Sequence, residues 1–169
     1  MIVRKEAESC FELYTVSSTV HMLPISDITI HRAQKVDFAD ASRLLEVFRT
    51  DEIATDEAHQ RLNLITTHPD QSLWIAKSKN QVIGLLGFRI RHNLETATEY
   101  GEVSSIVVDE RWQKRGVGQL LLDHAEALAR QHGCLGLWLV SGFGREEQAH
   151  NFYEAAGFGK TGFRFVKLF

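Results

Sequence analysis

The stretch from Ser105 to Leu122, SIVVDERWQKRGVGQLLL, is typical of a buried apolar strand that runs through a polar turn and a two-glycine loop into an amphipathic helix. The first N–H groups of a helix lack partners inside the helix, and the helix dipole adds partial positive charge at that end. Gly116 and Gly118 let the backbone approach a ligand closely. The preceding Lys114 and Arg115 add positive charge. This loop therefore predicts a binding site for a diphosphate group.

Two well-known phosphate-binding loops do not match this stretch. It is not the Gly-x-x-x-x-Gly-Lys-Ser/Thr loop of nucleotide triphosphatases. It is also not a Gly-x-Gly-x-x-Gly loop with an acidic residue about twenty positions later, which would indicate a dinucleotide. Binding of ATP or NAD is therefore disfavoured.

The loop sequence Gln113–Gly118, QKRGVG, follows Val108 at a spacing of five residues. This arrangement resembles motif A of the GNAT superfamily of N-acetyltransferases, in which Val or Ile precedes Gln/Arg-x-x-Gly-x-Gly/Ala. The string alone is common, and a simple glycine-rich connection between a strand and a helix is the alternative.

A second motif supports the resemblance. Residues Ala149–Phe158, AHNFYEAAGF, are similar to motif B of the same superfamily, Ala-x-x-Phe-Tyr-x-x-x-Gly-Phe. The two motifs occur in the family's order, with room for one helix and one strand between them. The resemblance implies an α/β fold with a mixed central β-sheet flanked by helices, a GNAT-like acyl-CoA N-acyltransferase fold. It covers residues 28–169 and leaves residues 1–27 as an N-terminal extension of unclear role.

Hydrophobic periodicity and turn residues predict the same order of elements. The expected strands cover residues 28–30, 73–76, 82–90, 100–108, 135–140 and 163–168, and the expected helices cover residues 36–48, 56–67, the segment from motif A to Gly133, and motif B. Simple alternation along 100–108 would place Val103, Ser105 and Val107 on one face. The strand at 135–140 is expected to be parallel to the strand at 100–108. Residues 1–27 could form an extra strand, a packed tail or a dimer arm, so a homodimer is possible.

The composition limits which binding partners and which cellular compartment are expected. The chain has 169 residues, enough for one domain with one sizeable core. Its net charge of −3 and scattered basic residues do not suggest a nucleic-acid or membrane partner. The histidines show no metal-binding spacing, and no metal is expected. Two cysteines, and the lack of a signal peptide or a membrane-spanning run, favour a cytoplasmic location.

The resemblance implies acetyl-CoA as the donor and a set of residues that would hold it. Backbone N–H groups from Lys114 to Gln119 would bind the pyrophosphate, and Gln113 would brace the loop. Pantetheine would lie along the end of the 100–108 strand, where a bulge in the family opens a V-shaped slot. A backbone N–H near Ile106 or Val107 would stabilise the oxyanion. The expected coenzyme residues are Ile106, Val107, Val108, Gln113, Lys114, Arg115, Gly116, Val117, Gly118, Gln119, Asn151 and Phe152.

One position of motif B departs from the family. Many members carry an Asn three residues before the Ala of motif B, where it contacts pantetheine, and this chain has Glu146 there. Asn151 is available to compensate from the motif B helix.

Two residues are candidates for proton transfer. The resemblance assigns the Tyr of motif B, Tyr153, as the acid that protonates the leaving thiolate, a role that suits a phenol still protonated at neutral pH. Packing in the apolar stripe of the helix is the alternative reading. Glu102 stands where the histone-acetylating branch of the superfamily carries its catalytic glutamate, and it is the candidate base. A solvated strand residue is the alternative for Glu102, with Glu99, Tyr100 or bulk solvent as other bases.

These observations lead to one expected function and two alternatives. The expected function is direct transfer of the acetyl group of acetyl-CoA to a primary amine of a small molecule or peptide. An acidic group, Asp51, Glu52, Asp56 and Glu57, would suit a cationic amine, although such helix surfaces are usually only solvated. The alternatives are a non-catalytic acyl-CoA-binding or regulatory module and a protein acetyltransferase that acts on lysines or N-termini.

Overall fold

The computed structural model describes residues 27–46, 55–95, 97–141 and 146–169. In chain order, the elements are β1 (Ile28–Arg32), the 3-10 turn η2 (Lys35–Asp37), α1 (Phe38–Leu45), α2 (Thr55–Thr67), β2 (Gln71–Ser78), β3 (Gln81–His92), β4 (Glu99–Val108), the 3-10 turn η4 (Glu110–Trp112), α3 (Val117–Gln131), β5 (Gly136–Leu139) and α4 (Glu146–Ala155). The N-terminal extension, with its possible roles in dimerisation or packing, lies outside the described residues except for Asp27.

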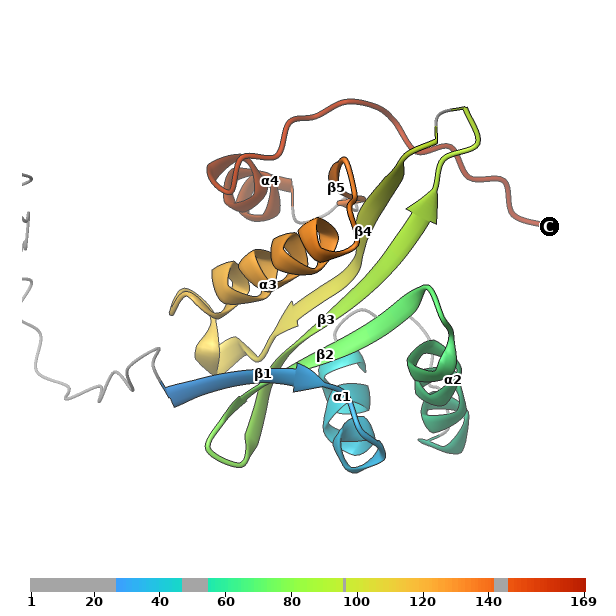
Figure 1. The fold of residues 1–169 in the computed structure, drawn as a ribbon. Helices are drawn as coiled ribbons and strands as arrows, with labels where there is room; N and C mark the ends of the chain where they lie inside the picture. Colours follow the sequence, from blue (N-terminus) through green and yellow to red (C-terminus); the bar gives the residue numbers. More distant parts are fainter. Residues whose placement is uncertain (1–26, 47–54, 96, 142–145) are drawn as a thin grey trace, which may run out of the picture.

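The strands form one mixed sheet in the order β1-β2-β3-β4-β5 (Figure 1). Neighbours from β1 to β4 are antiparallel. Short connections join β2 to β3 and β3 to β4, whereas α1 and α2 lie between β1 and β2. β5 is parallel to β4, and α3 makes the crossover between them. The predicted mixed sheet is confirmed, and so is the predicted parallel pairing of the strand at 135–140 with the strand at 100–108.

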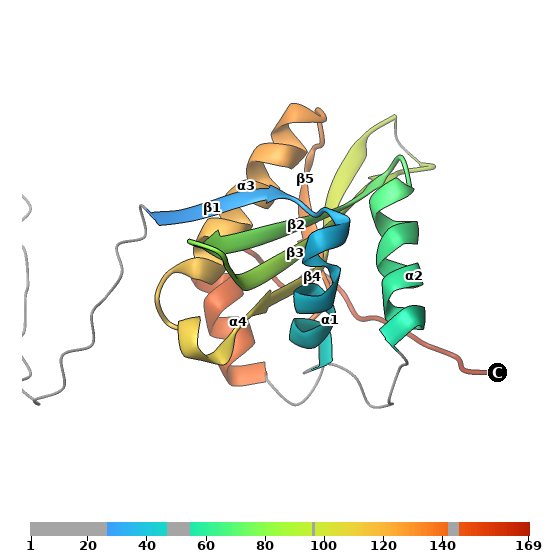
Figure 2. The ribbon, with the colours of Figure 1, turned by 90° about the horizontal axis from the view of Figure 1, so that it is seen from below.

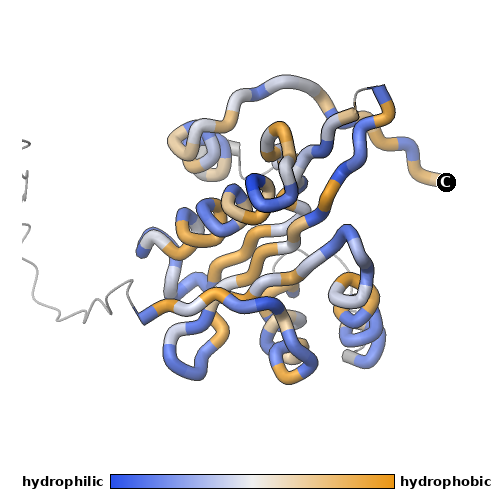
Figure 3. The backbone as a smooth tube through the Cα atoms, in the orientation of Figure 1, coloured by the Kyte–Doolittle hydropathy of each residue, from blue (hydrophilic) through white to orange (hydrophobic). Residues whose placement is uncertain are grey.

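Helices cover both faces of the sheet, α3 and α4 on one and α1 and α2 on the other (Figures 1 and 2). Each face has its own apolar core. Leu86 of β3 and Leu121 of α3 belong to the first core, and Leu85 of β3 and Leu62 of α2 belong to the second. Figure 3 shows the most apolar stretches in the central strands, which are buried on both faces.

β4 contains a β-bulge at Ser104. Phe88 of β3 lies opposite Val103, and the preceding Gly87 lies opposite Ser105, so Ser104 is an extra residue without a partner on β3. Across the bulge the alternation of side chains is shifted by one residue. Val103 therefore packs in the core under α3, whereas Val107 packs in the core under α1 and α2. The expectation that these two valines share a face is wrong for this reason.

The pairing of β4 with β5 ends at the same point. The parallel ladder runs from Tyr100 and Gly136 to Val103 and Leu139, and β4 then continues to Val108 paired with β3 alone in the described part of the chain. β5 ends with this ladder, so the second half of β4 has no β5 residue beside it.

Two expected elements differ in the structure. Residues 163–168 alternate as a strand would, but the segment after α4 runs past the sheet without pairing to it (Figure 1). A strand needs a neighbour to supply backbone hydrogen bonds, and Phe163 and Phe165 stay 92% exposed. The helix expected at 36–48 begins at Phe38, because Val36 lies in η2, and Phe48 is outside the described residues.

Gly101 of β4 tests the packing where β4 meets β5. A Cβ at Gly101 would lie 2.7 Å from Leu137 Cδ2 and 2.8 Å from Phe88 Cε2. We expect Gly101→Ala to lower the free energy of unfolding by about 1–3 kcal/mol through overpacking, measured by urea denaturation. Gly162→Ala, whose Cβ would meet nothing within 4 Å, is the matched control. Equal stabilities of the two variants would contradict this account of the packing.

Candidate functional site

The connection from β4 to α3 is fixed by Asp109, which is buried at the end of β4. Its backbone N–H donates to the Ile83 carbonyl at 2.9 Å. Its carboxylate accepts from the Arg111 backbone N–H at 3.1 Å and from the Arg111 guanidinium at 3.0 Å, and Arg43 of α1 donates to it at 3.4 Å. The Arg111 guanidinium is the largest cause that lowers the pKa of Asp109 to about 2, against the opposing effect of burial. This carboxylate thus ties the start of the loop to α1 on the opposite face of the sheet.

The glycine loop has the backbone that its sequence predicts. Gly116 is the N-cap of α3 with φ +82°, a left-handed conformation that favours glycine, and Lys114 also has positive φ, +57°. The Gln113 side-chain amide donates to the Val108 carbonyl at 3.2 Å, so it links the loop to the end of β4. Arg115 lies over the Trp112 ring at 5.5 Å from its centroid.

The first turn of α3 is suited to an anion. The Leu120 N–H donates to the Gly116 carbonyl at 3.0 Å, the first such bond of the helix. The N–H groups of Val117, Gly118 and Gln119 come before it and have no helical acceptor four residues back. This turn carries no acidic side chain, so no negative charge repels an anion at the positive end of the helix dipole.

α4 packs directly against this loop. A Cβ at Gly118 would lie 3.2 Å from Phe152 Cζ, so the glycine also permits close contact between α3 and α4. Tyr153 is half-buried, with ring centroids 5.2 Å from Phe152 and 6.0 Å from Phe158. Burial raises the pKa of the Tyr153 hydroxyl. Asn151 is exposed on α4, and Glu146 is the first residue of that helix.

Glu102 lies on β4 one residue before the end of the β5 ladder. Its cross-strand partner on β3 is Arg89. Arg91 Nε approaches Glu102 Oε2 to 3.3 Å, and Arg89 Nη1 approaches Oε1 to 3.8 Å. Glu99, an alternative base, instead contacts His92 Nδ1 at 2.8 Å.

Most of the predicted site residues therefore lie close together in the structure, and Glu102 lies apart from them. The loop Gln113–Gln119, Phe152 and the end of β4 adjoin each other, whereas Glu102 lies on the other side of the bulge. Sequence reasoning missed Asp109, although an acid directly after an apolar strand and two residues before an arginine is a recognisable capping signal. Of the acidic group expected near the acceptor, Asp51 and Glu52 lie outside the described residues. Glu57 at the start of α2 pairs with Arg61 at 2.6 Å.

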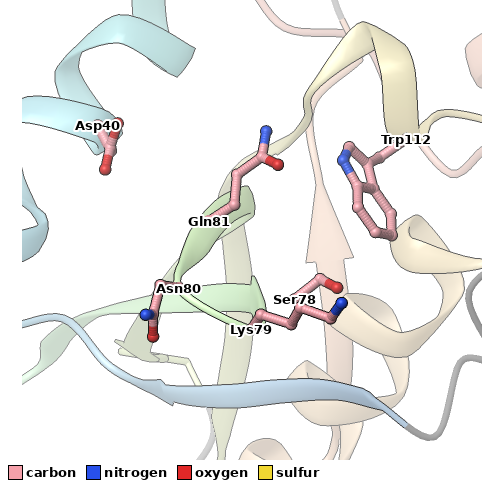
Figure 4. Close-up of a pocket in the computed structure, with 6 residues that line it drawn as sticks. All are labelled: Asp40, Ser78, Lys79, Asn80, Gln81 and Trp112. Carbon is pink, nitrogen blue, oxygen red and sulfur yellow. The ribbon is translucent and has the colours of Figure 1, made fainter.

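A separate hollow of about 530 Å³ lies at the β2–β3 turn (Figure 4). It is lined by Asp40, Ser78, Lys79, Asn80, Gln81 and Trp112. None of these residues belongs to β4, β5 or α4, so this hollow is separate from the unpaired edge of β4.

The described ranges contain no group of three or more His, Cys, Asp or Glu side chains placed to hold a metal ion. None of the helices in these ranges has both the length and the apolar character needed to cross a bilayer.

The motifs and the fold agree with a known family. The model of the acetyltransferase (GNAT) family matches residues 38–158, most of the chain. The chain belongs to this family.

Individual proteins similar to this chain in sequence or structure are N-acetyltransferases. Over 99 residues the chain is 30% identical to the aminoalkylphosphonate N-acetyltransferase of Salmonella typhimurium, covering 59% of this chain and 64% of that protein. The chain thus spans less than two thirds of this relative's length. Glucosamine-6-phosphate N-acetyltransferase of Arabidopsis thaliana has a similar structure, with a TM-score of 0.70 and 18% identity over 84% of this chain and 98% of that chain. An aminoglycoside N-acetyltransferase in complex with CoA has a TM-score of 0.74 and 17% identity over 83% and 93% of the two chains.

The network around Asp109 gives a test by pH. Because the folded-state pKa is depressed, the carboxylate stabilises the fold above the unfolded pKa of about 4, and this contribution is lost as pH falls toward 2. We expect Asp109→Asn to lower the free energy of unfolding at pH 7 by about 2 kcal/mol. Urea denaturation should show this difference unchanged from pH 8 to 5 and smaller below pH 4. A difference that does not depend on pH would contradict the assignment.

Proposed function

We propose that this protein transfers the acetyl group of acetyl-CoA directly to a primary amine of a small molecule. The observation that carries the proposal is the end of the β4–β5 ladder at Val103, which leaves the second half of β4 unpaired on that side, next to the glycine loop. Past Val103, the outer edge of β4 is free of β5, and this edge leads straight to the first turn of α3. An elongated molecule with a diphosphate at one end and an amide-containing arm matches these two features.

This geometry supports the coenzyme assignments. Gln113, Lys114 and Arg115 would flank the diphosphate, and the N–H groups from Gly116 to Gln119 would bind it. Ile106, Val107 and Val108 would receive the pantetheine arm as an added strand, and Asn151 and Phe152 would border it from α4. Family membership, and CoA bound to a protein of the same fold, support this choice of coenzyme.

Tyr153 is the proposed acid. Transfer requires a proton for the departing thiolate, and a phenol with a raised pKa remains protonated at neutral pH. Its position on α4, next to the Phe152 that contacts Gly118, supports this role. Glu102 is the proposed base that removes a proton from the attacking amine.

Direct transfer, without an acyl-enzyme, is supported by Cys134. Burial, and to a smaller extent the Glu99 charge, raise the pKa of this thiol, which opposes formation of the nucleophilic thiolate. The other cysteine, Cys10, lies outside the described residues. The neutral amine would therefore attack the thioester carbon, and the thiolate would leave with the proton from Tyr153.

The coenzyme assignment can be tested at Gly116. Because Gly116 has φ +82°, a β-branched side chain there would distort the loop and obstruct the anion site. We expect Gly116→Val to abolish binding of acetyl-CoA, measured by calorimetric titration, while circular dichroism shows a folded protein. Gly159→Val, at an exposed glycine with nothing within 4 Å of an added Cβ, is the control. Unchanged affinity in folded Gly116→Val would refute the assignment.

The acid can be tested by removing one oxygen atom. We expect Tyr153→Phe to lower kcat by about 10²–10⁴-fold with little change in coenzyme affinity. Because the pKa of Tyr153 is raised, its ionisation should cause no fall in wild-type kcat below about pH 10. Near-normal turnover by the variant would remove Tyr153 from the mechanism.

The function as a whole is tested by coenzyme titration followed by a thiol-release assay over a panel of amines and peptides. Binding with turnover of a small amine supports the proposal. Turnover restricted to peptides would indicate a protein acetyltransferase, and binding without any turnover would indicate a regulatory module.

A further inference from the structure

The carboxylate of Glu102 is enclosed but incompletely hydrogen-bonded. Its side chain is 14% exposed, and Oε2 is shielded from solvent. Within the described ranges Oε2 accepts no hydrogen bond, because the contact with Arg91 is an ion pair without hydrogen-bond geometry. An enclosed acceptor without a donor is unfavourable. This oxygen therefore keeps an unused acceptor position.

The two neighbouring guanidinium groups also have free donors. Arg89 is 39% exposed and Arg91 is 55% exposed, so both reach the solvent. In the described part of the chain, their contacts with other side chains are the ion pairs with Glu102, and neither donates a hydrogen bond. Guanidinium groups bind planar or tetrahedral oxyanions with paired N–H donors.

These arginines line a hollow of about 420 Å³ at the end of β3. His68 borders it from the turn after α2 and accepts the Asp70 backbone N–H at Nδ1, at 3.1 Å. The proton of its neutral ring therefore lies on Nε2, where it can be donated. The hollow thus offers donors from β3 and from the α2–β2 turn.

The other carboxylates in this region contact the ring of His92. His92 Nδ1 lies 2.8 Å from Glu99 Oε1, and His92 Nε2 lies 3.7 Å from Asp70 Oδ1. Among the described residues, Glu102 is the carboxylate that contacts Arg89 and Arg91. Asp70 also lines the hollow. Both guanidinium groups keep N–H donors that their ion pairs with Glu102 do not use, next to one unpartnered acceptor oxygen.

Glu102, Arg89 and Arg91 lie beside the proposed reaction site. Glu102 pairs with Trp138 of β5 one rung before the ladder ends, so it borders the unpaired half of β4. Arg89 and Arg91 lie two residues apart on β3, on the same face as Leu85, which is covered by α1 and α2. A molecule in the hollow would therefore approach this half of β4 from the face opposite α3 and α4.

We propose that the acceptor is a small zwitterionic amine, whose oxyanion group binds Arg89 and Arg91 while its amine reaches Glu102. This inference rests on the proposed acetyl transfer and names the substrate class for it. The shared chemistry is a carboxylate, phosphate or phosphonate on the same molecule as the amine. A neutral amine of equal length would leave the free guanidinium N–H donors without an oxyanion acceptor.

The test compares three amines on the full chain: aminoethylphosphonate, β-alanine and ethanolamine. We expect wild-type kcat/KM to be at least about 10-fold higher for one of the two anionic amines than for ethanolamine. Arg89→Gln and Arg91→Gln should lower this ratio by about 10–100-fold, chiefly through KM for the anionic amine. Arg130→Gln, at an exposed residue of α3 paired with Glu126, is the matched control. The order of the two anionic amines distinguishes a phosphonate from a carboxylate preference.

A second measurement separates this proposal from the proposed function. Each anionic amine is titrated into CoA-saturated protein, and the Arg89→Gln and Arg91→Gln variants should lose its binding. Binding that is lost in the variants, without turnover in the wild type, would support the subsite and refute acetyl transfer. Equal turnover of anionic and neutral amines, or a ratio that the arginine variants leave unchanged, would overturn the subsite and leave acetyl transfer intact.

Discussion

The extra residue at Ser104 is the constraint on which the rest of the structure depends. Ser104 has no partner on β3, and β4 keeps its pairing with β3 on both sides of this residue through a β-bulge. The glycine opposite makes room for it, since a Cβ at Gly87 would lie 2.6 Å from Ser104 Oγ. The bulge shifts the alternation of side chains in the second half of β4 by one residue. The ladder between β4 and β5 ends one residue before the bulge, at Val103. Past this point, no strand of the described residues pairs with the β5 side of β4.

The elements beside this unpaired edge of β4 are held by a small number of polar contacts. Asp109 connects the end of β4 to Arg111 in the loop and to Arg43 on α1, and Gln113 connects the loop back to Val108. Such contacts fix the N-terminus of α3 relative to the strand that precedes it. Preorganised backbone N–H groups bind an anion with little reorganisation, which is the advantage of a helix terminus over flexible lysine side chains.

The two faces of the sheet carry different chemistry. On one face, α3 and α4 cover the sheet with apolar contacts, and Phe152 packs against Gly118. On the other face, Glu102 and two arginines keep charged groups close together with unused hydrogen-bonding capacity. Under the proposed function, the coenzyme and the acceptor would approach from these different sides, and the thioester would meet the amine at the bulge.

The sequence by itself determined the order of the elements, the family and the backbone of the loop. These features depend on local signals, namely apolar periodicity, the paired glycines and the Phe-Tyr motif, and Gly116 has the left-handed conformation expected of it. Tertiary structure decided the features that need a partner. The face of Val107 depends on the bulge in the pairing of β4 with β3, the segment at 163–168 has no neighbouring strand, and Glu102 contacts Arg89 through the cross-strand register. Local propensity cannot specify these, because each depends on which residue lies opposite in space rather than on which residue is adjacent in the chain.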